Sequence, residues 1–375
     1  MRLLTVEPHP SYVGGSETVA ISLSRELAAR GHHVVLLHDS AGPMIERYAQ
    51  FCGSIVRREL PGVSLRSPGR TLAAAIRVRQ VLKENRIDAA FSANVGFLES
   101  AALVSAISGA PFCFHLALPF VPGSNRLRIA LRRTGFGVAP SEQTAATWRA
   151  AGWAASRLSV VPNWVDTNRF SPSLNRRALR VRLGLPADGT CITFLGRLCP
   201  EKGVGDLLDA FSQVRAKVPT AILVLVGEPA PYYLSELSSR ISELDAGCRD
   251  QTLCFKATRS PEDYLAASDI VCVPSWEETF GLVVLEAMAC GIPVVATSVG
   301  VFSDLVGPQG ANLLAPPRDS TALATRLLWC LGHQQEAKEI GRSLRQRAVE
   351  HFGPQKSVNA YESILQALAG RKGVE

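Results

Sequence analysis

Short apolar runs and longer amphipathic segments alternate along nearly the whole chain. This alternation is typical of parallel α/β sheets, in which each strand is followed by a covering helix. In the first half of the chain we expect strands at residues 1–6, 34–37, 89–92, 112–115, 137–139 and 158–161. In the second half we expect them at residues 191–195, 221–226, 253–255, 270–273 and 294–296.

The amphipathic segments between these runs are predicted to be helices. The first covers residues 16–30, with Ala20, Leu23 and Leu27 on one face, Ser16 as its cap and Gly31 at its end. Further helices are expected at residues 205–217, 232–246, 282–290 and 355–369.

A turn-rich stretch divides the chain. Residues 162–172 contain two prolines and lead from the first α/β series into the second, which is the composition expected of an interdomain linker. We therefore expect one Rossmann-like domain at residues 1–165 and another at residues 166–353, with a cleft between them. Residues 354–375 are expected to form a C-terminal helix that crosses back to the first domain. In such sheets ligands bind beyond the carboxyl ends of the strands.

Composition narrows the class of protein. With 47% hydrophobic and 19% charged residues, the 375-residue chain has a globular composition, and it has no apolar run of membrane-spanning length. We expect its beginning to be a strand and not a signal peptide. The nine cysteines are scattered without a CxxC pair, which indicates reduced thiols in a cytoplasmic protein and no zinc site or disulfide. The net charge of +7 favours anionic partners, but the sequence has no nucleic-acid-binding motif, so we expect no nucleic acid.

The most informative segment is residues 274–291, PSWEETFGLVVLEAMACG, directly after an expected strand. The free amides at the start of its helix, around Gly281 to Val283, offer an anion site. Glu286 is the one charge in an otherwise apolar helix, so it must find a strong partner or face a wet cavity. It either contacts a ligand or is a structural residue bonded to the backbone. Glu277 is expected to face solvent, and Glu278 is expected to face the site.

This segment resembles the Glu-x7-Glu signature of glycosyltransferase family 4, because seven residues separate Glu278 from Glu286. The resemblance implies a GT-B fold, with the first domain binding the acceptor and the second binding the donor. It also implies transfer that retains anomeric configuration without a metal. By resemblance Glu278 lies beside the hydroxyls of the donor sugar, and Glu286 bonds the nucleotide ribose. The backbone amides near Phe280, Gly281 and Leu282 would hold donor sugar or phosphate oxygens.

A second segment, Gly196 to Gly203, is similar to the family's Gly-Arg-Leu-x-x-x-Lys-Gly element. The resemblance assigns Arg197 and Lys202 to neutralising the diphosphate, which suits the charge that develops on the leaving nucleotide. The alternative is a solvated basic loop. With these two cations a metal is unnecessary, and the sequence has no Asp-x-Asp element to bind one.

Two features of the first half also resemble the family. Gly14 and Gly15 stand where the family has a glycine-rich loop, whose amides would meet phosphate or sugar. His115 ends an expected strand where family members carry a histidine close to the donor sugar and acceptor. A histidine after an apolar strand is also common as a structural residue, and both readings stay open.

Further matches come with departures from the family pattern. Residues 161–166 resemble Val-x-Pro-Asn-Gly-Val-Asp with Trp164 in place of the glycine, and Gly227 ends a matching strand. The segment around Ala257, residues 255–259, corresponds to the loop that reads the base, but a glycine common there is missing. After the strand at 294–296 the family's Gly-Gly-x-x-Glu is altered, with Val301 for the second glycine and Asp304 for the glutamate.

These resemblances imply a hexosyltransferase that uses a UDP- or GDP-linked donor and a hydroxyl acceptor, in polysaccharide, glycolipid or glycoside biosynthesis. The alternatives are a sugar-nucleotide epimerase of similar fold and an inactive nucleotide-sugar-binding subunit. The basic stretch 125–133 is either a membrane-surface segment for anionic lipid or a solvated helix. We expect a cytoplasmic protein, peripheral at the membrane if the first reading of that stretch holds.

Overall fold

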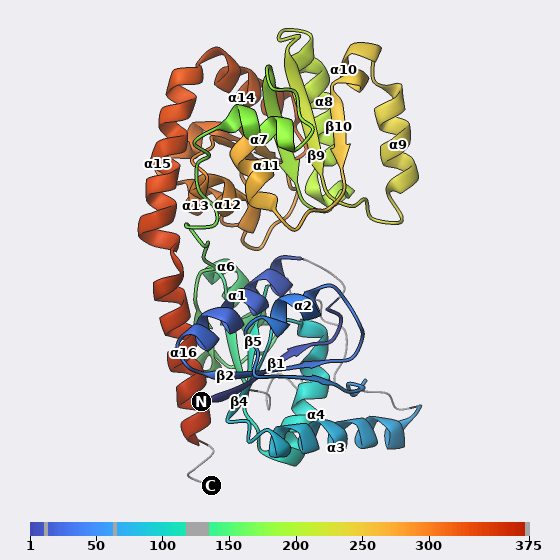
Figure 1. Ribbon diagram of the computed structural model, residues 1–375, viewed down its shortest axis with the longest axis vertical. Coiled ribbons are helices and arrows are strands. Elements are labelled where there is room, and N and C mark those ends of the chain that lie inside the picture. Colours follow the sequence, from blue (N-terminus) through green and yellow to red (C-terminus); the bar gives the residue numbers. More distant parts are fainter. Residues whose placement is uncertain (11–13, 63–65, 118–134, 372–375) are drawn as a thin grey trace. The chain divides into compact units, whose positions relative to one another are not determined.

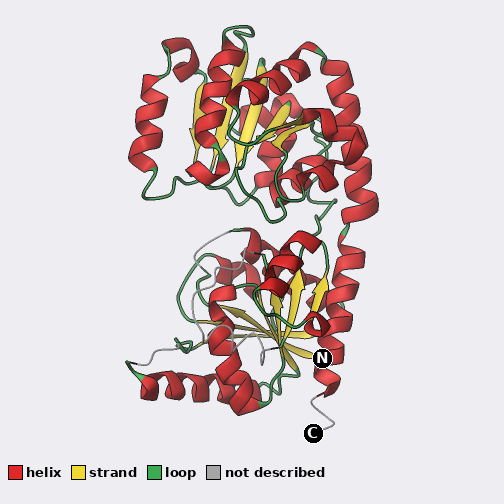
Figure 2. Cartoon of the chain, turned by 180° about the vertical axis from the view of Figure 1, so that it is seen from behind, coloured by secondary structure: helices red, strands yellow, loops and turns green. Residues whose placement is uncertain are grey.

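The computed structural model describes residues 1–10, 14–62, 66–117 and 135–371. Two compact units make up the chain, Met1–Asn163 with Gln355–Glu375, and Trp164–Pro354. In each unit a parallel sheet has helices on both faces (Figures 1 and 2). The basic stretch 125–133 lies outside the described residues.

The first unit contains a seven-stranded sheet in the order β3-β2-β1-β4-β5-β6-β7. Its order reverses between β1 and β4, which is the arrangement of a doubly wound α/β sheet. The strands are β1 Arg2–Glu7, β2 His33–His38, β3 Ser54–Arg57, β4 Ala89–Ser92, β5 Phe112–His115, β6 Phe136–Ala139 and β7 Leu158–Val160. The described helices of this unit are α1 Gly15–Ala29, α2 Met44–Ala49, α3 Pro68–Glu84, α4 Leu98–Ser108, α6 Glu142–Ala150 and α16 Pro354–Arg371.

The second unit contains a six-stranded sheet in the order β10-β9-β8-β11-β12-β13. Here the order reverses between β8 and β11. The strands are β8 Thr190–Leu195, β9 Ala221–Val226, β10 Thr252–Phe255, β11 Ile270–Val273, β12 Val294–Thr297 and β13 Leu314–Ala315. The helices are α7 Arg176–Arg182, α8 Val204–Arg215, α9 Leu234–Glu243, α10 Ala246–Asp250, α11 Pro261–Ala267, α12 Leu282–Ala289, α13 Phe302–Gly310, α14 Ser320–Gly332 and α15 Gln334–Phe352.

Burial on both faces explains why the strands read as continuous apolar runs. All six residues of β9 are buried, as are all four of β4, β5, β11 and β12. Strands covered on both faces carry no polar alternation. Every strand predicted from the sequence is present, with ends that differ by at most one residue from those expected.

Two predicted helix details were wrong. Helix α1 begins at Gly15 with Gly14 as its cap, not at a Ser16 cap, because the Glu17 carboxylate accepts the Gly14 N–H at 3.1 Å and so satisfies the first turn. The helix expected over residues 232–246 is two helices, α9 and α10. Leu244 is extended there, and the Asp245 side chain starts the second helix by accepting the Cys248 amide at 2.9 Å.

Within the described ranges, none of the helices combines the length and the apolar character needed to cross a membrane.

Candidate active site

Several loops gather at the carboxyl edge of the second unit's sheet. The Gly196 amide donates to Val226 O at 3.0 Å, and the Leu198 amide donates to Glu228 O at 2.9 Å. The Trp276 amide donates to Glu201 O at 2.9 Å. The loops that follow β8, β9 and β11 are therefore joined through their backbones, at the edge where parallel sheets bind ligands.

Glycine makes this close approach possible at two positions. Gly203 has a φ of +68°, and a Cβ there would collide with the carbonyl oxygen of Pro274. Gly300 has a φ of +54°, and a Cβ there would collide with the carbonyl oxygen of Glu278. Left-handed backbone favours glycine, and in both places no room exists for a side chain. The loops after β8 and β12 consequently pack directly against residues 274–278.

Lys202 and Glu278 meet in this assembly. The Lys202 ammonium donates to Glu278 Oε2, and the two side chains are 29% and 17% exposed. Lys202 ends a short turn, Pro200–Lys202, and Gly203 then turns the chain into α8. Glu278 follows β11, whereas Glu277 beside it is exposed, as predicted. A cation and a carboxylate therefore lie side by side, both partly open to a ligand.

The start of α12 has the geometry expected of an anion site. Gly281 caps the helix with a φ of +87°, and a Cβ on it would collide with the Phe302 ring. Phe280 is buried, while Leu282 and Val283 in the first turn are half-buried. The amides of this turn carry the positive end of the helix dipole.

Glu286 lies one turn further along α12 and is half-buried between apolar neighbours. Burial raises the pKa of its carboxyl to about 8, a rise that the nearby Arg169 opposes and Glu262 reinforces. Within the described ranges its carboxylate accepts no hydrogen bond from backbone or side chain. The described residues therefore do not support the alternative that Glu286 is a structural residue bonded to the backbone.

The sequence did not point to Arg169. Its guanidinium donates to Arg259 O at 3.0 Å and to Glu262 at 2.8 Å. Asp166 sets its position, because the Asp166 carboxylate accepts the amides of Asn168 and Arg169, each at 3.1 Å. The Asp166 of the Val-x-Pro-Asn-x-Val-Asp element thus forms a turn that aims Arg169 at the end of segment 255–259.

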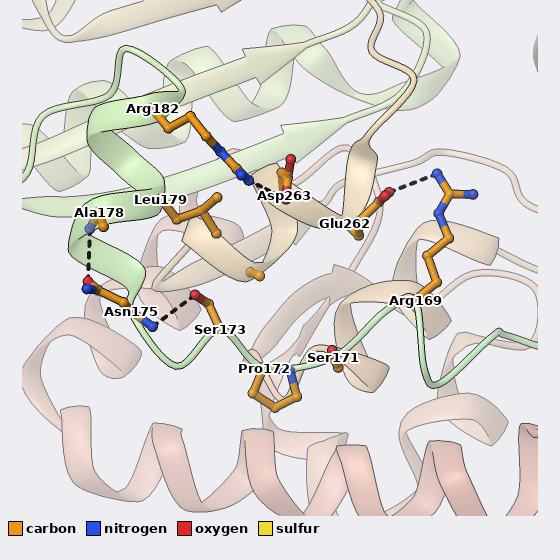
Figure 3. A pocket seen from close by; sticks show the side chains of 11 residues that line it. Arg169, Ser171, Pro172, Ser173, Asn175, Ala178, Leu179, Arg182, Glu262 and Asp263 are labelled. Carbon is orange, nitrogen blue, oxygen red and sulfur yellow. Dashed lines mark hydrogen bonds and ion pairs between the residues drawn. The ribbon is translucent and has the colours of Figure 1, made fainter.

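A pocket of about 390 Å³ lies beside Arg169, between the linker, α7 and α11 (Figure 3). Two ion pairs border it, Arg169 with Glu262 at 2.8 Å and Arg182 with Asp263 at 2.9 Å. Hydroxyl and amide groups of Ser171, Ser173 and Asn175 complete a polar wall. Both of these arginines are therefore already paired with carboxylates of α11.

The other residues predicted for the donor site lie at the same edge. Arg197 is exposed beside the Lys202 turn, and Gly227 follows β9, where its amide donates to Phe255 O at 2.9 Å. Ala257 is exposed after β10, and its amide lies 3.4 Å from the Glu228 carboxylate. The residues predicted for this unit all follow the carboxyl end of β8, β9, β10 or β11: Gly196, Arg197, Lys202, Gly227, Ala257, Glu278, Phe280, Gly281, Leu282 and Glu286.

Two departures from the family pattern are accommodated. Trp164 is buried, and the described non-glycine residues with positive φ are Arg86 and Arg318, so the turn at Trp164 needs no glycine. Val301 is buried and precedes the first turn of α13, while Asp304 is exposed in that turn.

Gly14, Gly15 and His115 belong to the first unit. Gly14 caps α1, and Gly15 is exposed at the helix start. The buried Glu7 ends β1 nearby, and burial together with the Glu17 charge raises the pKa of its carboxyl to about 8. His115 is fully buried at the end of β5, and its Nδ1 lies 2.7 Å from the Tyr361 hydroxyl.

No group of three His, Cys, Asp or Glu side chains suited to a metal occurs among the described residues.

Two family profiles match the chain. The sequence profile of glycosyltransferase family 4 matches residues 13–169, and that of the group 1 glycosyl transferases matches residues 175–347. The chain belongs to glycosyltransferase family 4. The family 4 resemblance seen in the sequence is therefore confirmed.

Curated family relatives match part of their length. A D-inositol 3-phosphate glycosyltransferase of Stackebrandtia nassauensis is 37% identical over 181 residues, 46% of this chain and 40% of the relative. Another with that name, from Kineococcus radiotolerans, is 30% identical over 239 residues, 59% of this chain and 55% of the relative. The chain thus matches about half the length of these curated relatives.

Solved structures match over the whole chain. Anabaena HepE in complex with UDP and glucose is 25% identical with a TM-score of 0.85, covering 98% of this chain and 99% of that one. Sucrose-phosphate synthase of Thermosynechococcus elongatus is 22% identical with a TM-score of 0.82, covering 99% of each chain, and shows the fold alone. The predicted GT-B fold, two parallel-sheet Rossmann-like domains, is confirmed.

Proposed function

We propose that this family 4 chain is a retaining glycosyltransferase that moves a hexose from a UDP-linked donor to a hydroxyl acceptor. The observation that carries the proposal is the meeting of Lys202 with Glu278 at the carboxyl edge of the second sheet. Lys202 supplies positive charge for the diphosphate, and Glu278 supplies a carboxylate that accepts hydrogen bonds from sugar hydroxyls. UDP is proposed over GDP because the full-length match to Anabaena HepE includes structures with UDP and with UDP-glucose.

In the proposed reaction the bond between the anomeric carbon and the diphosphate breaks, and the electron pair leaves with UDP. Arg197, Lys202 and the amides at Gly281 and Leu282 stabilise that departing charge. The acceptor oxygen then bonds to the same face of the sugar, and its proton passes to the released phosphate oxygen. Retention follows because departure and attack share one face. Glu278 orients the sugar and is not assigned as a base.

Glu286 completes the donor site in this proposal. A half-buried carboxyl without a partner in the described residues is costly unless a ligand group reaches it. The two hydroxyls of a ribose are such groups. With its pKa at about 8 the free carboxyl is mostly protonated at pH 7, and two donated hydroxyl hydrogen bonds would favour its ionised form.

We further propose that no metal takes part, because Arg197 and Lys202 already provide two cations for the diphosphate. Transfer should proceed at the same rate in EDTA as in Mg²⁺. Cytoplasmic location and contact of residues 125–133 with anionic membrane stay predictions. Pelleting with anionic vesicles at low and high salt tests the second.

The first experiment is a thermal-shift screen against UDP, GDP, ADP and their hexose conjugates. A ligand that binds the folded chain raises the midpoint by mass action, and UDP ligands are expected to raise it most. Single-turnover assays with a panel of acceptors and NMR of the product's anomeric proton then test transfer and retention. An inverted product overturns the retaining mechanism. A UDP-hexose that binds but is neither transferred nor epimerised favours the inactive-subunit alternative, and an epimerised sugar favours the epimerase.

A further inference from the structure

His115 is joined to a residue 246 positions further along the chain. Its Nδ1 lies 2.7 Å from the hydroxyl of Tyr361, and both side chains are fully buried. His115 ends strand β5 at the carboxyl edge of the first unit's sheet, whereas Tyr361 comes from α16, which returns to this unit (Figure 1). The last helix of the chain therefore reaches the edge at which such sheets bind ligands.

Contacts other than the one with His115 fix the position of Tyr361. Its ring packs edge-on against Phe91, with centroids 5.9 Å apart. Helix α16 is fixed to the unit by Ser357, whose hydroxyl donates to Pro162 O at 2.8 Å. Glu362 adds ion pairs of 2.6 Å with both Arg30 and His32. The Tyr361 hydroxyl consequently has a defined place beside His115.

The protonation of the pair follows from its surroundings. Burial lowers the pKa of His115 to about 4, so the ring is neutral near pH 7 and carries one N–H. Burial raises the pKa of Tyr361, so its hydroxyl keeps its hydrogen. A phenol O–H is the better donor and an imidazole nitrogen the better acceptor of this pair. The Tyr361 hydroxyl therefore donates to Nδ1, which leaves the ring hydrogen on Nε2.

That Nε2 is buried, yet it has no hydrogen-bond partner among the described residues. Buried polar groups are nearly always paired, because an unpaired one has lost its hydration without gaining a new partner. An orphan N–H at the carboxyl edge of a parallel sheet indicates a partner that arrives with the substrate.

We propose that Tyr361 is a positioning residue that holds His115 as its Nε2–H tautomer, ready to donate a hydrogen bond to a sugar hydroxyl or ring oxygen of the substrate. The proposal rests on the proposed function, because it takes the ligand to be a sugar. It gives the C-terminal helix a part in the reaction that acts through His115.

Replacing His115 with an amide residue tests the two ring nitrogens one at a time. Glutamine places its N–H₂ near the position of Nε2, and asparagine places its N–H₂ near that of Nδ1. We expect the kcat of His115→Asn to be about tenfold or more below that of His115→Gln, the effect of one missing hydrogen bond. Equal activity of the two variants would overturn the role of Nε2–H.

Tyr361→Phe removes one hydroxyl and keeps the ring. We expect kcat to fall about tenfold with little change in the KM for the donor. In the His115→Gln background Tyr361→Phe should cause no further fall, because an amide has no tautomer to fix. Ser357→Ala is the matched control, since it removes an anchor of the same helix without touching His115. If Ser357→Ala lowers kcat as much as Tyr361→Phe, or if the double variant shows the full tenfold fall, Tyr361 acts only by seating α16.

Nitrogen-15 NMR of histidine-labelled full-length protein reads the tautomer without any turnover. The signals of His115 are identified by their loss in His115→Gln. Wild type should show a protonated Nε2 and an unprotonated Nδ1, and Tyr361→Phe should show a mixture. A protonated Nδ1 in the wild type overturns the inference even if transfer is observed. Absence of transfer with the expected tautomer overturns instead the proposed function.

Discussion

Lys202 and Glu278 lie 76 positions apart in the sequence and form an ion pair at the carboxyl edge of the second sheet. Each side chain follows a different strand, Lys202 after β8 and Glu278 after β11, and these strands are neighbours in the sheet. The pair lies where the strand order reverses, which is the usual ligand position in such sheets. The pair keeps hydrogen-bonding capacity for a ligand, because the ammonium has three N–H groups and the carboxylate has a second oxygen.

Substitutions of Lys202 and of Glu278 should have different effects on UDP affinity and on transfer. Lys202→Met removes the cation that we propose for the diphosphate. UDP affinity measured by calorimetry should therefore fall about tenfold or more. Glu278→Gln leaves Lys202 available to phosphate, so UDP affinity should hold or increase while transfer falls by roughly 10²-fold. Both variants should keep the wild-type melting temperature within a few degrees. Normal turnover by both variants would show that the site is assigned to the wrong residues.

Glu286 should make the stability of the unliganded protein depend on pH. Its pKa is about 8 in the folded state and near 4.5 unfolded, so between these values the folded state binds more protons. The free energy of unfolding then decreases as pH rises from about 5 to 8, by up to ~1 kcal/mol per pH unit from this group. Glu286→Gln has no proton to lose and should be more stable than wild type at pH 8–9, with little difference at pH 5.

Urea unfolding of wild type and Glu286→Gln at several pH values measures this difference. Glu277→Gln is the control, because that neighbouring carboxylate is exposed. Parallel pH profiles for wild type and Glu286→Gln would contradict the half-buried, unpaired state of Glu286. Glu286→Gln should also weaken UDP binding, whereas Glu277→Gln should not.

The sequence predicted the strands well because their physical cause is local. Strand β9 is six buried apolar residues, and a short apolar run bounded by turn residues is typical of a strand covered on both faces. Strand β3, Ser54–Arg57, was missed because it lies at the sheet edge, is half-exposed and carries polar residues at both ends. The division of α9 from α10 was missed because it depends on the Asp245 cap. A single acidic residue within an amphipathic pattern does not by itself predict a new helix start.

The site was predictable to a different degree for each residue. Glu286 stood out because a single charge in an apolar helix is a local anomaly. The pairing of Lys202 with Glu278 was not predictable, since it depends on how two loops fold against each other around Gly203 and Gly300. Arg169 gave no signal at all, because an arginine in a turn-rich linker is ordinary until its bond to Arg259 O is known.

Gly203 and Gly184 provide a direct test of the loop packing. Both have left-handed backbone, with φ of +68° and +71°, but a Cβ on Gly203 would collide with the Pro274 carbonyl, and a Cβ on Gly184 would meet nothing within 4 Å. Gly184→Ala should therefore cost about 1 kcal/mol of unfolding free energy, the strain of the backbone alone. Gly203→Ala should cost clearly more and should also impair transfer by displacing Lys202. Equal melting temperatures for the two variants would mean that residues 200–203 do not pack on Pro274.

Arg169 and Arg182 both line the pocket between the linker, α7 and α11, and they can be compared as a matched pair. Each forms an ion pair with α11, Arg169 with Glu262 and Arg182 with Asp263, but in the described residues the bond to Arg259 O comes from Arg169. Arg169→Met removes the hydrogen bond to Arg259 O and should make the end of segment 255–259 more mobile. We expect UDP affinity to fall about tenfold and the ratio of UDP affinity to ADP affinity to decrease.

Arg169→Met should also change the titration of Glu286, since the Arg169 charge lowers the pKa of that carboxyl. Without the charge the pKa rises further, so UDP binding, which requires the ionised carboxylate, should need a higher pH to reach its maximum. Calorimetric titrations with UDP from pH 6 to 9 measure both effects. Arg182→Met keeps the Arg169 contacts and should bind UDP as wild type does at every pH. A comparable loss of UDP affinity in Arg182→Met would show that breaking either ion pair to α11 disturbs the site. The hydrogen bond from Arg169 to Arg259 O would then have no specific effect.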